Sequence, residues 1–313
     1  MKLSVLEWLQ CPACGGDFTA EASDRSDVEV ADGRLVCAGC GAAHPIAQGV
    51  PRFVDSDAYV NSFSFEWTVH RTTQLDSVNG RTDSEKRLRS ELGFPLEDLQ
   101  GKLVLDVGCG TGRFAEIALR HGATVVGVDL SLAVDAAHTN LGGQPRMHVL
   151  QADVFRLPLK RDVFDVVYSI GVLHHTPDCR KALEQLPKHV KPGGRLAITV
   201  YIAANRVYIA SSNFWRRLTT RLPKRVLHAF CHIAAPLYYL YKVPGLHHLG
   251  MAVFPINMDP DWRWRVLDTF DTYSPRYQSY HTHPEVFGWF ENAGFRNIRV
   301  LGPAVTVTGE KPY

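Results

Sequence analysis

From residue 103 onward, the apolar residues fall into short runs that alternate with helix-like segments. Residues 103–107 read Leu-Val-Leu-Asp-Val, a β-prone run that suits a strand buried on both faces. The same pattern predicts further strands at 124–129, 147–154, 164–171 and 195–201, and helices at 114–120 and 180–189. Because strands and helices alternate, we expect an α/β protein with a doubly wound, mostly parallel sheet.

A glycine-rich turn follows the first predicted strand. Gly108, Gly110 and Gly112 alternate there, so bare backbone can approach a ligand beside the unpaired N–H groups of a helix start. The dinucleotide fingerprint needs glycine at position 113, where Arg113 stands, and the Gly-Lys-Ser/Thr of a phosphate P-loop is absent. The remaining pattern is Asp106-x-Gly-x-Gly-x-Gly. Taken alone, this stretch also fits a plain structural turn.

Two Cys-x-x-Cys pairs mark the first part of the chain. The first pair is Cys11 and Cys14, and the second is Cys37 and Cys40. Twenty-two residues lie between Cys14 and Cys37, and each pair lies in a glycine-bearing turn. Four thiolates suit tetrahedral Zn²⁺ in a closed structural site, although a ribbon that has lost its metal and a redox-active pair are the alternatives. We also expect a β-hairpin between the pairs, with strands at 28–30 and 34–36.

The glycine turn resembles motif I of the class I S-adenosylmethionine (SAM) methyltransferases. Further family motifs follow in order at Asp129, Asp153 and residues 164–178. The resemblance covers residues 100–202 and the C-terminal tail. It implies a Rossmann-like seven-stranded sheet that ends in an antiparallel hairpin, with a helical insert after strand 5. The N-terminal cysteines are similar to the short zinc ribbons found ahead of some bacterial methyltransferases.

The resemblance also implies a cofactor site at the carboxyl ends of the strands. Asp129 lies 21 residues after Gly108, where a carboxylate can accept two hydrogen bonds from ribose hydroxyls; capping the next helix is its other possible role. By resemblance, Asp153 and the backbone of Val154 meet the adenine ring. The predicted SAM-binding residues are Asp106, Gly108, Gly110, Gly112, Asp129, Leu130, Asp153, Val154 and Ile170.

Methyl transfer depends mainly on positioning, with a general base where the acceptor is a hydroxyl or a protonated amine. His174 and His175 follow the fourth strand and are the first candidates for the base, ahead of His281 and His283. A structural role for the His174–His175 pair is the alternative. Arg276 and Tyr277 are the candidates for holding an anionic or hydroxyl-bearing substrate.

The chain divides into three expected parts. Residues 1–54 form the zinc-ribbon-like domain, 55–101 a helical connector or lid, and 102–313 the methyltransferase domain. Within the last part, 205–258 contains no Asp or Glu and interleaves basic with aromatic residues. We expect this insert to cap the substrate; contact with a membrane surface through 205–242, a dimer surface and a nucleic-acid contact are the alternatives. The tail predicts a capping box at 282–285 and places the loop 273–283 at the sheet edge that carries the histidine pair.

Composition adds few constraints. The 313 residues carry a net charge of +2, which argues neither for nor against nucleic acid as a partner. No signal peptide is evident at the start, and the cysteine usage indicates a reducing compartment, so we expect a cytoplasmic protein, peripheral to the membrane if the insert binds one.

Together these features predict a SAM-dependent methyltransferase that acts on an O, N or C acceptor of a small-molecule, glycan or lipid-like substrate, as a monomer or homodimer. One alternative is an RNA methyltransferase that uses the ribbon as an RNA clamp, although residues 1–54 are more acidic than basic. The other is a non-catalytic SAM-binding interaction module.

Overall fold

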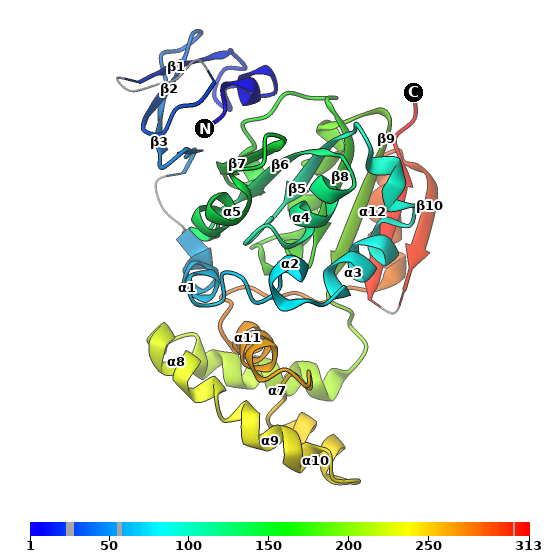
Figure 1. Ribbon diagram of the computed structural model, residues 1–313. Helices are drawn as coiled ribbons and strands as arrows, with labels where there is room; N and C mark the ends of the chain where they lie inside the picture. The colour runs from blue at the N-terminus through cyan, green and yellow to red at the C-terminus, as the bar shows by residue number, and fades with distance from the viewer. Residues whose placement is uncertain (23–27, 55–57, 303) are drawn as a thin grey trace.

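The computed structural model describes residues 1–22, 28–54, 58–302 and 304–313, and these form two separate β-sheets (Figure 1). The smaller sheet comes first and has four antiparallel strands in sequence order. Its elements are the 3₁₀ helix Leu3–Glu7 and the strands β1 (Phe18–Glu21), β2 (Gly33–Cys37), β3 (Ala43–Ala47) and β4 (Val50–Pro51). The two Cys-x-x-Cys pairs therefore lie in turns that flank β1 and β2.

The larger sheet has seven strands in the order β10-β11-β9-β8-β5-β6-β7. They are β5 (Leu103–Val107), β6 (Thr124–Asp129), β7 (Met147–Gln151), β8 (Phe164–Ile170), β9 (Val190–Val200), β10 (Arg296–Leu301) and β11 (Val305–Glu310). Strands β5 to β9 pair in parallel, whereas β11 pairs antiparallel with both β9 and β10. This arrangement confirms the doubly wound, mostly parallel sheet with a C-terminal hairpin.

Helices cover both faces of the larger sheet, because alternate residues of the buried strands point to opposite sides. Leu105 and Val107 pack in one hydrophobic cluster with α6 and α12, and Val104 packs in another with α3, α4 and α5. The bounds are α3 (Asp83–Leu92), α4 (Arg113–Arg120), α5 (Ala133–Leu141), α6 (Cys179–Leu183) and α12 (His283–Asn292). The predicted capping box opens α12.

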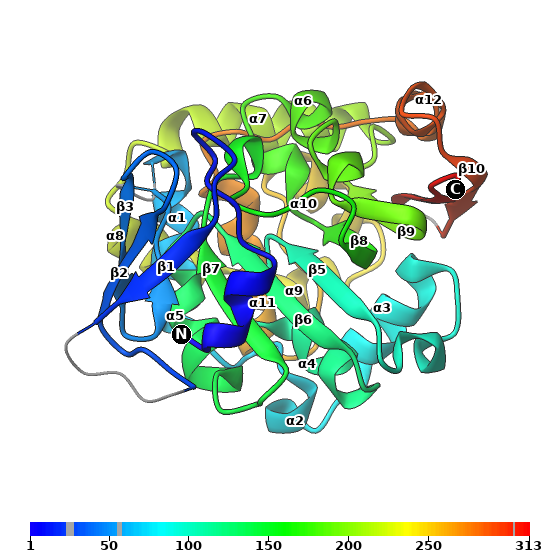
Figure 2. The same ribbon diagram turned by 90° about the horizontal axis from the view of Figure 1, so that it is seen from above.

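The N-terminal sheet packs beside β7, at the end of the larger sheet opposite β10 (Figure 2). Just after β4, Arg52 forms a parallel bridge with Gln151, and the Phe53 N–H donates to the Gln151 carbonyl at 2.8 Å. Leu9 forms an antiparallel bridge with Leu159. The core of the small sheet is therefore continuous with one face of the large sheet.

The hairpin predicted with strands at 28–30 and 34–36 is wrong. Glu29 instead bridges Lys2, and the Val30 N–H donates to the Met1 carbonyl at 2.8 Å. Strand β2 pairs with β1 on one side and with β3 on the other. The pairing was mispredicted because a distant segment, the chain start, occupies the position beside 28–30.

The predicted helix at 180–189 and the predicted start of the next strand at 195 also need correction. Helix α6 ends at Leu183, and a separate 3₁₀ turn at Leu186–Lys188 contains Pro187, which lacks the N–H needed to continue a helix. Residues 191–194 belong to β9, where the pairing with β8 shifts register between Phe164 and Val166.

The insert and the connector form a helical layer at one end of the large sheet (Figure 1). The connector contributes α1 (Asn61–Val69) and α2 (Asp76–Asn79), and the insert and the segment after it contribute α7 (Arg206–Thr219), α8 (Lys224–Cys231), α9 (Ala234–Tyr241), α10 (Leu246–Val253) and α11 (Trp262–Tyr273). Within the described ranges, no helix has the length and apolar character needed to cross a membrane.

Candidate active site

The glycine turn after β5 adopts a backbone that few residues other than glycine tolerate. Gly108 has a φ of +81°, and a Cβ built on it would lie 2.4 Å from both γ-carbons of Val172. Its N–H donates to the Val128 carbonyl at 2.7 Å, and the Gly110 N–H donates to Asp129 Oδ2 at 2.9 Å. The turn is thus held against the end of β6 and exposes bare backbone on its other side.

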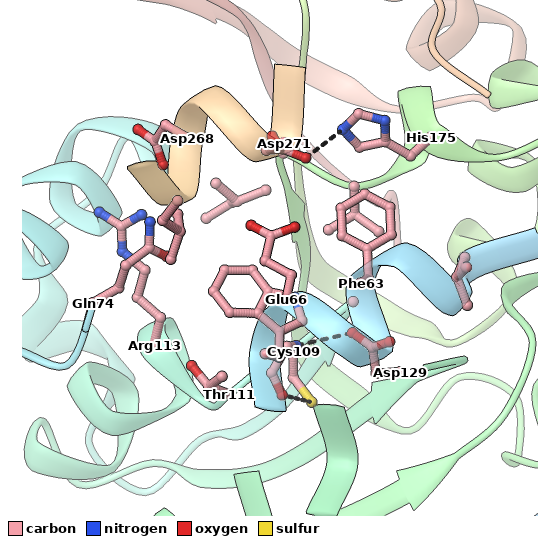
Figure 3. A pocket seen from close by; sticks show the side chains of 18 of the residues that line it. Phe63, Glu66, Gln74, Cys109, Thr111, Arg113, Asp129, His175, Asp268 and Asp271 are labelled. Carbon is pink, nitrogen blue, oxygen red and sulfur yellow. Dashed lines mark hydrogen bonds and ion pairs between the residues drawn. The ribbon is translucent and has the colours of Figure 1, made fainter. Parts of the chain in front are cut away.

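A cavity of about 640 Å³ lies at the carboxyl ends of β5, β6 and β8, bounded on its far side by α1 and α11 (Figure 3). In a doubly wound sheet this edge is where ligands bind. Six of the nine residues predicted to bind SAM line this cavity, namely Gly108, Gly110, Asp129, Leu130, Val154 and Ile170.

The other three predicted SAM-binding residues do not line the cavity. Asp106 is 2% exposed and accepts a hydrogen bond from the Tyr168 hydroxyl at 3.1 Å, and burial raises the pKa of its carboxyl to about 8. Gly112 precedes α4 with a φ of +91°. The Asp153 carboxylate accepts from the Phe155 N–H at 3.0 Å. These three residues support the walls, and a direct role in binding SAM stays a prediction.

The Asp129 side chain organises the junction between β6 and the turn. Its Oδ1 accepts from the N–H and the hydroxyl of Ser131 at 2.8 and 2.7 Å, while Oδ2 holds Gly110. Burial raises the pKa of this carboxyl. It does not cap α5, which begins at Ala133. A carboxylate oxygen has two lone pairs, so Asp129 retains acceptor capacity toward the cavity.

Helix α1 forms a wall of the cavity and also packs against the insert. Phe63, Glu66 and Trp67 line the cavity, and Trp67 ring atoms lie 3.7 Å from a Cβ built on Gly110. Phe65 instead stacks toward Phe270 of α11, with ring centroids 5.7 Å apart. Helix α1 thus contributes aromatic residues both to the cavity and to the packing against α11, and its movement as a lid stays a prediction.

His175 and Asp271 face each other across the end of the cavity away from the glycine turn (Figure 3). His175 Nδ1 lies 3.1 Å from the Tyr277 carbonyl, so Nδ1 carries the proton and the neutral ring presents Nε2 as an acceptor. Nε2 lies 3.8 Å from Asp271 Oδ1, and Asp271 Oδ2 accepts from the Tyr201 hydroxyl at 2.8 Å. Burial lowers the pKa of His175, which favours the neutral ring.

Glu66 and Asp268 line the same end of the cavity as Asp271, and the three carboxyl groups are called the acidic wall below. Glu66 is 1% exposed, and neither of its carboxylate oxygens has a hydrogen-bond partner among the described residues. Burial, followed by repulsion from Asp271 and Asp268, raises the pKa of Glu66 well above its usual range. Burial and Asp271 raise the pKa of Asp268 to about 7, although Arg113 acts in the opposite direction.

Among the predicted catalytic residues, His175 alone lines the cavity. His174 is fully buried behind it and stacks on Tyr201 with ring centroids 3.7 Å apart. Arg276 is exposed, and its guanidinium lies over the Tyr277 ring at 5.5 Å. Tyr277 contributes its backbone carbonyl, which orients His175. The loop 273–283 thus lies over the histidine pair, as predicted, since the Ser279 N–H also donates to the His174 carbonyl at 2.8 Å.

The sequence-based site omitted Glu66, Asp268 and Asp271. The two aspartates are three positions apart in α11, a spacing that places them on one helix face, and this signal could have identified them. Glu66 stands in a helix whose other cavity residues are aromatic, and no local pattern marks it.

The four cysteines of the N-terminal unit come together as one cluster. Their sulfur atoms all lie within 4.8 Å of one another, with 3.8 Å between Cys11 and Cys40 and 3.4 Å between Cys14 and Cys37. The N–H groups of Gly16 and Gly39 each lie 3.4 Å from a cysteine sulfur.

Comparison with known proteins agrees with this architecture. Residues 105–198 match the family described as "Methyltransferase domain", and residues 2–49 match the family described as "Trm112p-like protein". A ubiquinone biosynthesis O-methyltransferase of Paracidovorax citrulli is 40% identical over 134 residues, which cover 42% of this chain and 56% of the relative. A tRNA U34 carboxymethyltransferase of Pseudoalteromonas atlantica is 35% identical over 134 residues, which cover 38% and 41%.

The chain spans about half the length of the curated relatives it matches. Among solved structures, a SAM-dependent methyltransferase from Aquifex aeolicus is 18% identical, with a TM-score of 0.44 over 79% of this chain and 96% of that one. The match to the methyltransferase domain agrees with the strand order of the larger sheet, and the match to the Trm112p-like family covers the unit that holds the cysteine cluster. Residues 105–198 of the chain therefore match a methyltransferase domain, and the four-cysteine unit that precedes them matches the Trm112p-like family.

Proposed function

We propose that the protein transfers a methyl group from SAM to an O or N acceptor on a small-molecule substrate. One observation carries the proposal: a single cavity joins the glycine turn and Asp129 to a buried polar wall with an acceptor nitrogen on His175. The first end suits a nucleoside-bearing cofactor, and the second suits a group that must lose a proton.

At the cofactor end, the predicted roles fit the residues present. Asp129 accepts from a ribose hydroxyl through the Oδ2 lone pair that Gly110 leaves unused, since Ser131 occupies Oδ1 with two hydrogen bonds. The bare backbone of Gly108 and Gly110 allows close approach, and Val154 lines the part of the cavity assigned to adenine. When bound, SAM supplies an activated methyl group on a sulfonium.

At the acceptor end, we assign His175 as the general base. The Tyr277 carbonyl fixes its tautomer, so Nε2 receives the proton, and Asp271 at 3.8 Å stabilises the imidazolium that forms. A positioned base of this kind contributes about 10²- to 10⁴-fold in rate. Most of the remaining acceleration comes from holding the acceptor in line with the S–CH₃ bond.

We further propose that the four-cysteine cluster binds a structural Zn²⁺. A tetrahedral ion with Zn–S bonds of about 2.3 Å needs sulfur–sulfur distances of about 3.8 Å. The 3.8 and 3.4 Å separations fit this requirement with small adjustment. With all four ligands from the protein the site is closed, so we assign the metal a role in folding residues 1–54 and none in the reaction.

Calorimetry with SAM and with S-adenosylhomocysteine tests the cofactor assignment. Asp129→Asn should weaken binding about tenfold or more, because a charge-assisted hydrogen bond is lost. Asp98→Asn, which changes an exposed aspartate away from the cavity, is the matched control. Absence of SAM binding by the wild-type protein would show that the proposal is wrong.

Incubation with methyl-labelled SAM and separated metabolite, lipid and RNA pools tests the acceptor. We expect label in a small-molecule pool and its loss in His175→Gln. Label confined to RNA would contradict a small-molecule acceptor. It would favour an RNA methyltransferase, the alternative to which the similarity with the tRNA U34 carboxymethyltransferase points. SAM binding without label in any pool would favour a non-catalytic module.

A further inference from the structure

The acceptor end of the cavity holds an excess of buried hydrogen-bond acceptors. Four atoms there have no hydrogen-bond partner in the described part of the chain: both carboxylate oxygens of Glu66, Oδ1 of Asp271 and Nε2 of His175. All three side chains line the same cavity, and they approach it from α1, α11 and the loop after β8 (Figure 3). Buried polar atoms are normally paired, so this set indicates a ligand that brings donors.

His175 makes the excess of acceptors unambiguous. Because Nδ1 is held by the Tyr277 carbonyl, the neutral ring turns a lone pair, and no N–H, toward Asp271. Two acceptor atoms thus face each other at 3.8 Å. A donor placed beside both would satisfy them, whereas a ligand that only accepts hydrogen bonds would leave both atoms unpaired.

Several neighbouring donors of the protein bind other groups, although Arg216 Nε, in the vicinity of His175 and Asp271, has no hydrogen-bond partner among the described residues. The Tyr201 hydroxyl binds Asp271 Oδ2, and Asn257 Nδ2 binds Asp268 Oδ2 at 2.9 Å. Arg113, which lines the other side of the cavity, donates through Nε to Ser84 at 3.0 Å and stacks over aromatic rings.

Charge decides between the kinds of donor. Arg113 and Arg87 partly offset the charge of Asp268, and Arg216 acts on Asp271. The carboxyl group of Glu66 is affected only by burial and by repulsion from Asp271 and Asp268, and a cation beside Glu66 and Asp271 relieves this repulsion more than a neutral hydroxyl does. An ammonium group offers up to three donors and a positive charge. Aromatic side chains, Phe63 and Tyr208 among them, line the same cavity and provide faces on which a cation is stabilised.

We propose that the methyl-accepting substrate is an organic amine whose ammonium group is bound by Glu66 and Asp271 beside His175. This inference rests on the proposed function, because it names the substrate class of that same cavity. It assigns Glu66 as a substrate-binding residue, a role that neither the family motifs nor the cofactor geometry gives it.

Matched pairs of small ligands test the inference. We would titrate 2-phenylethylamine against 2-phenylethanol, and 1,4-diaminobutane against 1,4-butanediol, by calorimetry with and without saturating S-adenosylhomocysteine. Each amine should bind at least about tenfold more tightly than its alcohol, the difference expected for a hydrogen-bonded charge. Binding should also release protons to the buffer, since a cation favours the ionised carboxylates.

Two variants locate the site. Glu66→Gln keeps the shape and removes the charge, so it should abolish the preference for the amine, and Asp271→Asn should reduce it. Glu97→Gln, an exposed control outside the cavity, should retain it. Thermal unfolding and S-adenosylhomocysteine binding show whether each variant is folded.

The outcomes separate this inference from the proposed function. If S-adenosylhomocysteine binds normally and the amines bind no better than the alcohols, or Glu66→Gln keeps the preference, the amine inference is wrong and the methyltransferase proposal stands. If S-adenosylhomocysteine does not bind while the amines do, the proposed function fails and the ammonium site stands on its own.

Discussion

Replacing Gly108 with alanine should destabilise the protein and disrupt the cofactor site. With φ at +81°, an L-residue at this position costs about 1–2 kcal/mol in backbone energy. The new Cβ would also lie 2.4 Å from both γ-carbons of Val172, well inside the ordinary contact distance of about 3.5–4.0 Å, and such overpacking costs about 1–3 kcal/mol. Together the two effects predict a loss of about 2–5 kcal/mol in the free energy of unfolding.

Urea denaturation followed by circular dichroism measures this loss, and calorimetry with S-adenosylhomocysteine measures the effect on the site. Gly143→Ala is the matched control: its Cβ meets no atom within 4 Å, so we expect a change within about 0.5 kcal/mol. Adding Val172→Ala to Gly108→Ala should relieve the overlap with the two γ-carbons, but neither the 2.8 Å contact with the Val172 Cβ nor the backbone cost, as a double-mutant cycle would show. Stability of Gly108→Ala equal to that of the control would refute the reasoning.

Three further predictions concern the rest of the molecule. Chelation of zinc, or Cys14→Ser, should unfold residues 1–54 first, seen as proteolysis confined to that unit; an unchanged digest would contradict a structural metal. Burial lowers the pKa of His148 to about 4, below the value near 6.5 expected in the unfolded chain. The free energy of unfolding should therefore fall by up to about 3 kcal/mol as the pH falls from about 6.5 to 4. In urea titrations His148→Phe should reduce this pH dependence, whereas His248→Phe, at an exposed position, should leave it unchanged. Arg52→Met should lower the free energy of unfolding by about 1–3 kcal/mol, because Arg52 donates hydrogen bonds to Gln151 and Asp135 at 2.8 and 2.6 Å. The ion pair of Arg34 with Glu21 is exposed, so Arg34→Met should change the free energy of unfolding by less than about 0.5 kcal/mol.

The features that the sequence predicted well are those set by local patterns. Apolar runs such as 103–107 must be buried on both faces, and this requirement alone indicates central strands of a parallel sheet. The capping box at Thr282 depends on residues three positions apart, and it was found in place. The glycine turn was likewise recognised from residues 106–112 alone, although Val128, Asp129 and Val172 supply the contacts that hold it.

Features built from distant segments were missed. The 28–30 segment pairs with the chain start because Lys2 and Met1 fold back onto it, and no dipeptide signal reports such an interaction. The acidic wall combines Glu66 with Asp271, more than 200 positions later, so its chemistry exists only once α1 and α11 pack together. The sequence motifs therefore predicted most of the residues at the glycine-turn end of the cavity, but only His175 at the opposite end.

The position of Glu66 depends on supports that reach back to the N-terminal unit. Arg52 fastens that unit to α5 through Asp135, at 2.6 Å. At the start of α5, the Leu132 N–H donates to the buried hydroxyl of Ser64 in α1, at 3.0 Å. Helix α5 is thus a shared support between the cysteine cluster and the helix that carries Glu66 into the cavity. The Trm112p-like unit is therefore connected to the wall that carries Glu66 through an ion pair and a hydrogen bond, although none of its described residues lines the cavity.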